Sequence, residues 1–198
     1  MAQRASGYER KERDLYETPE WVTGALCGEL LGRMQIVWEP AAGTGKMQRA
    51  LEAAGFRVLA SDIEPREHIE PADFLSANAA PEEVTAIITN PPYALAENFV
   101  RHALDLMRPR HGIVAMLLRV DWDSAKTRRD LFADHPAFAM KLTLLDRIQW
   151  FEGGGSSPSE NHAWFAWNWR ALGRMPALRW ADNPAKRRRA QLSLLEAP

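Results

Sequence analysis

The sequence has a single cysteine, Cys27, among its 198 residues. One cysteine excludes an intramolecular disulfide and a zinc site built from several cysteines. Long hydrophobic runs are also absent, since the longest aliphatic stretch, Ile113 to Leu118, is far too short to cross a bilayer. Residues 1–20 lack the apolar core of a signal peptide. These absences predict a cytoplasmic protein without a membrane partner.

The chain also lacks a strong excess of charge of one sign. Its 25 basic and 26 acidic residues give a formal net charge of −1, which argues against a uniformly basic nucleic-acid-binding surface. The charge is uneven, however, because residues 170–189 hold one acid, Asp182, against Arg170, Arg174, Arg179, Lys186, Arg187, Arg188 and Arg189. Such a run is either a solvated tail or a set of phosphate contacts, and it indicates nucleic acid only if other features do.

What the chain does have is the composition of an ordinary globular protein, with 46% hydrophobic and 26% charged residues. Its length fits one α/β domain. We expect a polar N-terminal segment over residues 1–14, a single domain over 15–170 and a basic C-terminal tail over 171–198.

Predicted helices and strands alternate along residues 18–118. Capping residues and helical spacing indicate helices over 18–34, 46–55 and 96–107, and short apolar runs indicate strands over 36–40, 56–62, 86–89 and 112–118. Strands separated by helices imply a parallel sheet with helices on both faces. Two β-rich runs, 141–151 and 161–169, then follow without a helix between them. The sequence therefore predicts an α/β fold whose doubly wound, mostly parallel sheet ends in an antiparallel hairpin.

Polar or glycine-rich loops follow three of these strands: "EPAAGTG" over 39–45, "SDIEP" over 61–65 and "TNPPY" over 89–93. Ligands of doubly wound sheets bind at the carboxyl ends of the strands, so the three loops should meet at one crevice. Gly43 and Gly45 would let a small molecule approach the backbone closely. Asp62, about 20 residues further on, would accept hydrogen bonds from ribose hydroxyls. Alone, the glycine pair is a weak signal, because most such pairs after a strand form a plain turn.

The third loop ends its strand abruptly. Neither Pro91 nor Pro92 offers a backbone N–H to a neighbouring strand, and Asn90, which precedes a proline, is biased away from helical geometry. Asn90, a bare proline carbonyl and the Tyr93 ring are therefore displayed at the strand tip.

In order, the segments "YETP", "EPAAGTG", "SDIEP", "ADFL" and "NPPY" resemble the motifs of S-adenosylmethionine-dependent adenine-N6 DNA methyltransferases of the NPPY type. The resemblance covers about residues 16–93 by motif and extends more loosely to about 169. It implies a Rossmann-like class I methyltransferase fold, S-adenosyl-L-methionine as cofactor and DNA as partner. The chain has no room for a separate target-recognition domain, as in a small phage- or prophage-type enzyme. Either recognition would come from residues 121–135, 152–161 and the basic tail, or specificity would be relaxed, or a partner would supply it.

The resemblance also implies roles for single residues. Thr18 and the 43–45 turn would hold the methionine end of the cofactor, Asp62 the ribose, and Asp73 with Phe74 the adenine. The full set of expected cofactor contacts is Tyr16, Thr18, Pro19, Glu39, Pro40, Ala41, Gly43, Gly45, Asp62, Ile63, Asp73, Phe74 and Asn90. Expected substrate contacts are Tyr93, Trp150, Phe151, Lys186, Arg187, Arg188 and Arg189. Trp150 and Phe151 are equally compatible with a place in the core of the hairpin.

The expected catalytic residues are Asn90, Pro91, Pro92 and Tyr93. The Asn90 amide oxygen and the Pro91 carbonyl would accept the two N–H groups of an exocyclic amine, aiming its lone pair at the methyl group. Tyr93 would stack on the base. Direct in-line transfer of this kind requires no covalent intermediate and no metal, and positioning supplies most of the rate. A base inside a duplex would have to be flipped out.

Three alternatives stay open on the sequence. The local chemistry of "NPPY" fits any planar nitrogen with two N–H groups, so an RNA base or a protein glutamine amide is also compatible. The "YETP" segment and the basic tail favour DNA. A cytosine-C5 methyltransferase is disfavoured, because that chemistry needs a cysteine nucleophile and Cys27 lies in the wrong place. A non-catalytic binding module for cofactor or nucleic acid is the alternative from another class.

Overall fold

A computed structural model describes residues 16–30, 36–150 and 160–188. These residues form an eight-stranded sheet in the order β3-β2-β1-β4-β5-β7-β6-β8. Its strands are β1 (Ile36–Glu39), β2 (Arg57–Asp62), β3 (Glu70–Pro71), β4 (Ala86–Thr89), β5 (Ile113–Arg119), β6 (Phe138–Leu144), β7 (His162–Asn168) and β8 (Ala177–Ala181). The helices are α1 (Glu20–Leu30), α2 (Lys46–Ala53) and α3 (Ala96–Met107), with short 3-10 turns at Phe74–Ser76, Tyr93–Leu95, Trp122–Ser124 and Lys126–Leu131.

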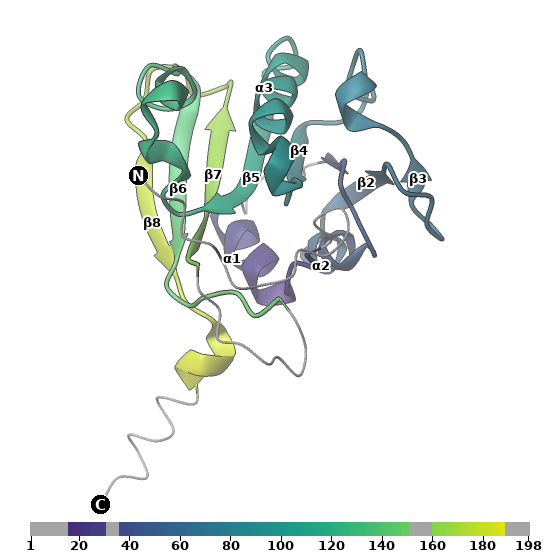
Figure 1. Cartoon of the computed structure of the whole chain (residues 1–198), viewed down its shortest axis with the longest axis horizontal. Coiled ribbons are helices and arrows are strands. Elements are labelled where there is room, and N and C mark those ends of the chain that lie inside the picture. The colour runs from purple at the N-terminus through teal and green to yellow at the C-terminus, as the bar shows by residue number, and fades with distance from the viewer. Residues whose placement is uncertain (1–15, 31–35, 151–159, 189–198) are drawn as a thin grey trace, which may run out of the picture.

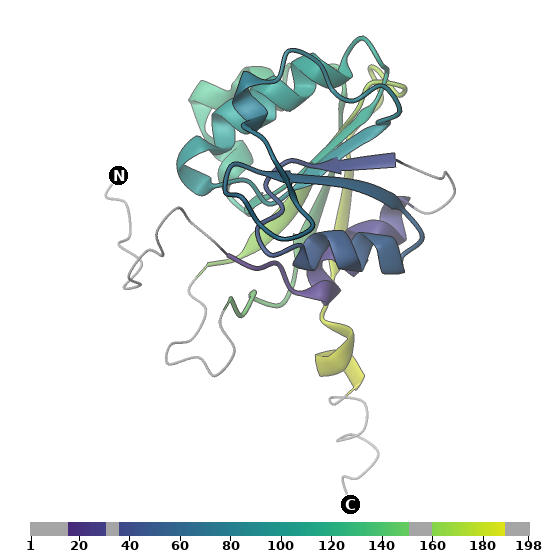
Figure 2. The same cartoon turned by 90° about the vertical axis from the view of Figure 1, so that its right-hand side faces the viewer.

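The predicted α/β fold is confirmed. Among the described strands, β7 alone runs antiparallel to its neighbours β5 and β6, and every other adjacent pair is parallel. Helix α3 covers one face of the sheet, and α1 and α2 cover the other (Figures 1 and 2). Because β1, β2, β4 and β5 all point the same way, their carboxyl ends share one edge of the sheet.

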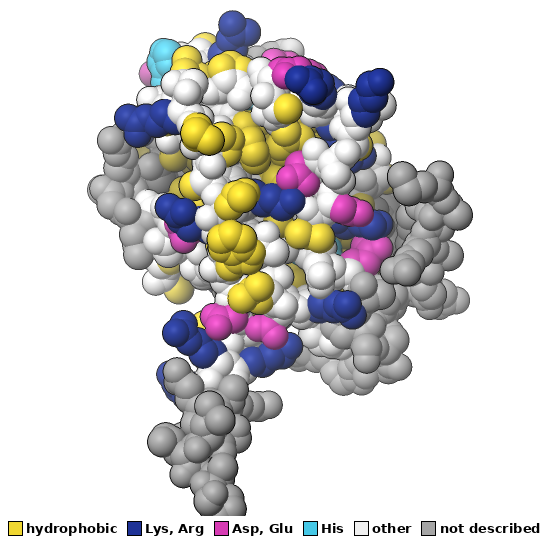
Figure 3. Space-filling model, turned by 90° about the vertical axis from the view of Figure 1, so that its left-hand side faces the viewer, with side chains coloured by type: hydrophobic (Ala, Val, Ile, Leu, Met, Phe, Trp, Pro, Cys, Tyr) yellow, Lys and Arg dark blue, Asp and Glu magenta, His cyan; other side chains and the backbone are white. Residues whose placement is uncertain are grey.

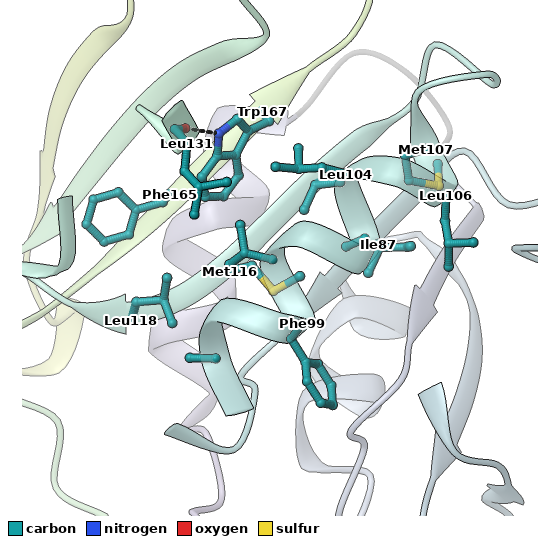
Figure 4. Packing of buried hydrophobic residues seen from close by; sticks show 14 of the residues in the cluster. Ile87, Phe99, Leu104, Leu106, Met107, Met116, Leu118, Leu131, Phe165 and Trp167 are labelled. Carbon is teal, nitrogen blue, oxygen red and sulfur yellow. Dashed lines mark hydrogen bonds between the residues drawn. The ribbon is translucent and has the colours of Figure 1, made fainter. Parts of the chain in front are cut away.

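Two apolar clusters hold the layers together. Under α3 the core includes Ile87, Leu104 and Met116 together with Phe165 and Trp167 (Figure 4). The Trp167 indole Nε1 donates to the Leu131 carbonyl at 2.7 Å, so this large ring is buried without an unpaired N–H. On the other face, α1 and α2 pack on the remaining side chains of the same strands, as predicted by the continuous apolar runs of strands that are buried on both faces.

Several element boundaries differ from those predicted. Helix α1 begins at Glu20, two residues after Thr18, and residues 31–34 of the predicted helix lie outside the described residues. Strand β6 runs from Phe138 to Leu144. It therefore starts three residues before the predicted run 141–151 and ends seven residues before the end of that run. The chain leaves β6 where the Asp146 carboxylate accepts the Asn183 backbone N–H at 2.7 Å.

Strand β8 was not predicted and lies within the segment assigned to a basic C-terminal tail. It pairs in parallel with β6 over five residues, from Met140↔Ala177 to Leu144↔Ala181. Its apolar side chains Leu178 and Trp180 are 58% and 63% exposed, so the strand lacks the buried face that sequence patterns detect. Apolar side chains gather on this side of the molecule (Figure 3). No helix in the described part of the chain is long and apolar enough to cross a membrane.

Candidate active site

A cavity of about 430 Å³ opens at the carboxyl ends of β1, β2 and β4. The three loops predicted to meet there do meet. Expected cofactor contacts that line the cavity are Tyr16, Thr18, Glu39, Pro40, Ala41, Gly43, Asp62, Ile63, Asp73, Phe74 and Asn90. Pro19 and Gly45 are not among the lining residues. Thr44, which belongs to the expected 43–45 turn, also lines the cavity. The sequence did not point to several other lining residues: Glu17, Ala42, Lys46, Met47, Glu64, Arg66, Ala72, Leu75, Leu95 and Phe99.

The turn between β1 and α2 is held by Asp62, the last residue of β2. Gly43 has a φ of 54°, and its N–H donates to Asp62 Oδ2 at 2.8 Å. Gly45, with a φ of 74°, is the N-cap residue directly before α2, and a Cβ there would lie 3.2 Å from Gln48 Oε1. Gly45 therefore shapes the turn without lining the cavity, and both glycines occupy backbone conformations that side chains disfavour.

The Asp62 carboxylate has two structural bonds and spare acceptor capacity. Its Oδ1 accepts the Glu64 N–H at 2.9 Å, in addition to the Gly43 bond on Oδ2. Each carboxylate oxygen has a second lone pair, so the group can also accept from a hydroxyl in the cavity. Next to it, Ile63 is 63% exposed and offers an apolar side chain to a ligand.

Glu39 is a buried carboxyl group with an unsatisfied atom. The residue is 2% exposed, and no hydrogen-bond partner for its Oε2 exists within the described ranges. Burial, and after it the negative charge of Asp62, holds the pKa of Glu39 well above its usual range. A buried carboxyl that lines a cavity in this state suits a cationic ligand, because a positive charge would offset the cost of ionising it.

Asp73 and Phe74 line the cavity from the segment that follows β3. The Asp73 carboxylate accepts from the Leu75 N–H at 3.0 Å and from the Ser76 hydroxyl at 2.6 Å. Phe74 is 2% exposed, with its ring 5.1 Å from the ring of Trp38 and 4.8 Å from that of Phe99. Asp73 thus fixes the local turn, and Phe74 belongs to the core while one surface of it lines the cavity.

At the tip of β4, the amide of Asn90 is oriented by one hydrogen bond. Its Nδ2 donates to the Tyr16 main-chain carbonyl at 3.2 Å, which fixes the end of the amide that carries the oxygen. The Oδ1 is buried, with no partner in the described part of the chain. Both Asn90 and Pro92 line the cavity. Buried acceptors without a donor are rare in native structures, so Oδ1 is a candidate acceptor for a ligand N–H or O–H group.

Four aromatic side chains from distant parts of the chain form a cluster that includes Tyr16, whose carbonyl accepts from Asn90, and Tyr93, three residues after Asn90. The Tyr93 ring stacks on Tyr16 at 5.9 Å between centroids and on His162 at 6.0 Å. Trp150 contacts the same two rings, at 5.5 Å from Tyr16 and 5.2 Å from His162. Trp150, an expected substrate contact, thus shares the neighbours Tyr16 and His162 with Tyr93. It also packs against the apolar core on the face covered by α1 and α2, as the alternative place in the core expects, so its role stays a prediction. His162 belongs to the same cluster, although the sequence did not point to it. Phe151 lies outside the described residues.

Part of the basic run is used within the protein. Lys186 Nζ lies 2.9 Å from Asp146 Oδ1, whereas Arg187 is 4.0 Å from Asp182, its nearest recorded carboxylate. Both basic side chains are exposed, as is Arg188. Arg189 lies outside the described residues. No cluster of three or more potential metal ligands occurs among residues 16–30, 36–150 and 160–188.

Neither a protein-family model nor a curated protein matches the chain. Solved structures do. One is a proposed class I S-adenosylmethionine-dependent methyltransferase from Listeria monocytogenes, with a TM-score of 0.58, 15% identity, and coverage of 89% of this chain and 70% of that one. Another is a proposed RNA methyltransferase from Pyrococcus horikoshii, with a TM-score of 0.59, 13% identity, and coverage of 83% and 93%. The chain has the class I methyltransferase fold.

A third similar structure is the methyltransferase subunit of a type I restriction-modification system from Streptococcus thermophilus, with a TM-score of 0.59 and 15% identity. The match covers 84% of this chain and 47% of that one, so the chain spans about half the length of that methyltransferase subunit. The class I methyltransferase fold places its ligand at the edge of the sheet where the cavity lies.

Proposed function

We propose that this chain transfers a methyl group from S-adenosyl-L-methionine to the exocyclic N6 amine of adenine in DNA. The observation that carries the proposal is the Asn90 amide oxygen, which is buried, unpartnered among the described residues and attached to a side chain that lines the cavity. Tyr16, whose carbonyl accepts from the Asn90 amide, and Tyr93 belong to a cluster of aromatic rings on which a planar acceptor would stack. The proposal unites the cavity, the orphaned acceptor and the aromatic cluster in one reaction.

The residues of the cavity fit the cofactor. S-Adenosylmethionine carries a sulfonium and an ammonium group, and the buried Glu39 carboxyl offers an unpaired oxygen to a cation. Asp62 has free lone pairs for ribose hydroxyls, and Ile63 with Phe74 offers apolar surface to the adenine ring. Thr18 and the turn at Gly43 complete the pocket at the methionine end.

When bound, the cofactor supplies an electrophilic methyl group; the chain's own residues prepare the nucleophile. Asn90 Oδ1 would accept one N–H of the amine, and the Pro91 carbonyl the other. Two acceptors favour a tetrahedral nitrogen whose lone pair points out of the ring plane. Because the Tyr16 carbonyl already holds the other end of the Asn90 amide, the acceptor is oriented before the substrate arrives. Little reorganisation then remains for the reaction.

The surroundings of Asn90 favour an aromatic amine over a glutamine amide. Tyr93, Tyr16, Trp150 and His162 form a continuous series of ring contacts between 5.2 and 6.0 Å. Aromatic faces stack on nucleobases whatever their sequence. An aliphatic side-chain amide would gain little from such a cluster. The exposed Arg187 and Arg188 support a nucleic-acid acceptor, and likeness to the restriction-modification subunit supports DNA within that class.

An RNA base is the second candidate, favoured by the likeness to the proposed RNA methyltransferase, 93% of which is covered. One experiment separates these acceptors. The protein is incubated with methyl-labelled cofactor and duplex DNA, RNA or a release factor, and labelled nucleosides or peptides are identified. N6-Methyladenine in DNA is expected, and it should be absent with Asn90→Ala. Label in RNA or in glutamine, or none in any acceptor with the wild-type protein, would contradict the proposal.

A further inference from the structure

His162 is a buried polar residue at the start of an otherwise apolar strand. It is the first residue of β7, is 2% exposed and pairs across the sheet with Arg119, the last residue of β5. The residues that follow it in β7, from Ala163 to Trp167, are buried hydrophobics. A buried imidazole is costly unless it is hydrogen-bonded. Its Nδ1 has no partner among the described residues, so the bond at Nε2 is the one that stabilises the position.

The partner at Nε2 is the hydroxyl of Tyr93. The Tyr93 oxygen lies 2.9 Å from His162 Nε2, and the two rings are nearly parallel, with 24° between their planes. Trp150 packs edge-on against the imidazole, at 82° and 5.2 Å between centroids. The imidazole is therefore held by the strand, by Trp150 and by the hydrogen bond, and it is a rigid support for whatever it contacts.

Tyr93 is consequently fixed at both ends. On the backbone side it follows two prolines whose φ angles are restricted by their rings, and the Leu95 N–H donates to the Pro92 carbonyl at 2.9 Å. On the far side its hydroxyl is hydrogen-bonded to His162. A ring held at its root and at its tip keeps one plane, whereas a ring held only at its root can swing about its side-chain torsions.

We propose that His162 is a positioning residue, which sets the plane of the Tyr93 ring for stacking on the acceptor base. This inference rests on the proposed function, because it assigns Tyr93 to the acceptor. His162 itself would touch neither the reacting nitrogen nor the methyl group. It acts through Tyr93, on the substrate side of the site and away from Asp62 and Glu39.

The charge of His162 is constant over the physiological range. Burial, and then the nearby Arg119 guanidinium, lowers its pKa to about 4, so the ring is neutral at pH 7. The charges that act on its pKa are those of Arg119 and Asp121, and the Glu160 backbone, as a polar group, favours the protonated ring. Arg119 is itself paired with the carboxylates of Asp121 at 3.1 Å and Glu160 at 3.0 Å. A neutral imidazole can form the Tyr93 bond in either tautomer. The bond is thus a permanent support.

The test is a double-mutant cycle with Tyr93→Phe and His162→Phe, which keep both rings and remove the hydrogen bond. Each single variant is expected to raise the acceptor KM and lower kcat/KM by about tenfold, and the double variant should be no worse than either. The Kd for S-adenosylmethionine should stay unchanged. His162→Gln, whose amide can still bond to the hydroxyl, should restore most of the loss. Additive losses in the double variant, or a matching loss in cofactor affinity, would overturn the inference.

A matched control and a second measurement separate this inference from the proposed function. His135→Phe removes a half-buried imidazole that packs on Trp169, away from the cavity, and should leave acceptor kinetics unchanged. Side-chain relaxation of Tyr93, labelled in its ring for NMR, should show increased motion in His162→Phe and not in His135→Phe. Unchanged relaxation in His162→Phe overturns the inference even if methyl transfer is found. Failure of the wild-type protein to methylate any acceptor overturns the proposed function instead.

Discussion

The side-chain nitrogen of Asn90 lies 3.2 Å from the main-chain carbonyl oxygen of Tyr16, a residue 74 positions earlier in the sequence. This bond joins the tip of β4 to the segment that leads into α1. It also orients the amide so that the buried Oδ1 faces away from the Tyr16 carbonyl. The segment of Tyr16, which lines the cavity, thus fixes the orientation of the proposed catalytic acceptor through this one contact.

Replacing Asn90 should separate chemistry from cofactor binding. Asn90→Ala removes the acceptor for the amine, and loss of one preorganised polar group of this type typically costs about 100-fold or more in kcat. The Kd for S-adenosylmethionine should change by much less. Tritium transfer to duplex DNA and calorimetric titration of the cofactor measure the two effects. Wild-type transfer rates in Asn90→Ala would refute the mechanism.

Asp62→Ala should weaken cofactor binding by about tenfold or more, since it removes the proposed ribose acceptor and leaves two backbone N–H groups, those of Gly43 and Glu64, without their partner. Asp62→Asn retains one carbonyl oxygen for these donors and should keep the turn better folded. Calorimetry with both variants distinguishes the two contributions. An unaltered affinity in Asp62→Ala would remove Asp62 from the cofactor site.

Cofactor affinity should rise with pH. Because burial raises the pKa of Glu39, part of the protein carries a protonated Glu39 above the usual titration range of a glutamate, and a cation binds best to the ionised form. Binding of S-adenosylmethionine should therefore release a proton. Calorimetry in buffers of different ionisation enthalpy measures this release, and Glu39→Gln should abolish it. No proton release in the wild-type protein would show that Glu39 does not face the cation.

His162 should make stability fall in mild acid. Its pKa is about 4 in the folded chain against about 6.5 ordinarily, so the unfolded state binds the extra proton first as pH falls. The stabilisation is fully present above pH 6.5 and is lost as pH falls through 6.5 toward 4, by roughly 3 kcal/mol in all. Urea unfolding of the wild-type protein and His162→Gln across this range isolates the effect. Parallel pH profiles of the two would contradict the assignment.

The basic run should contribute unequally to DNA binding. Lys186 is paired with Asp146 at 2.9 Å, whereas Arg187 lies 4.0 Å from Asp182, its nearest carboxylate among the described residues. Arg187→Ser and Arg188→Ser should each lower the slope of log K against log salt by about 1, and Lys186→Ser by less. Binding titrations between low and moderate salt give the slopes. If all three variants keep the wild-type slope, the run is a solvated surface.

From β1 to β5 the order of strands and helices, apart from the short β3, was predictable because it depends on local features that a sequence displays. The apolar runs of β4 and β5 are buried on both faces, and α3 begins and ends at the predicted residues. The meeting of the three loops followed from the parallel arrangement of their strands. Asn90, Asp62 and most of the other expected cofactor contacts line one cavity in the structure. Their roles stay predictions.

What could not be predicted depends on contacts between distant segments. His162 precedes an apolar run and resembles an ordinary flanking residue, and only the pairing of β7 with β5 brings it to Tyr93. Strand β8 has exposed apolar side chains and no alternation, so its pairing with β6 leaves no trace in the sequence. Asp62 was expected to face a ligand, yet its bond to Gly43 is a tertiary contact that no motif encodes.

The direction of β8 has a practical consequence. Because β8 is parallel to β6, and β6 to β5, the chain leaves the sheet at the same edge that holds the cavity. A DNA-binding module fused C-terminal to β8 would start on the side of the sheet that holds the cavity, four strand positions from β4. Such a tether would raise the effective concentration of the bound DNA strand near Asn90 without new contacts to it. The direction of one edge strand thus sets the side of the sheet from which a fused module would approach the proposed active site.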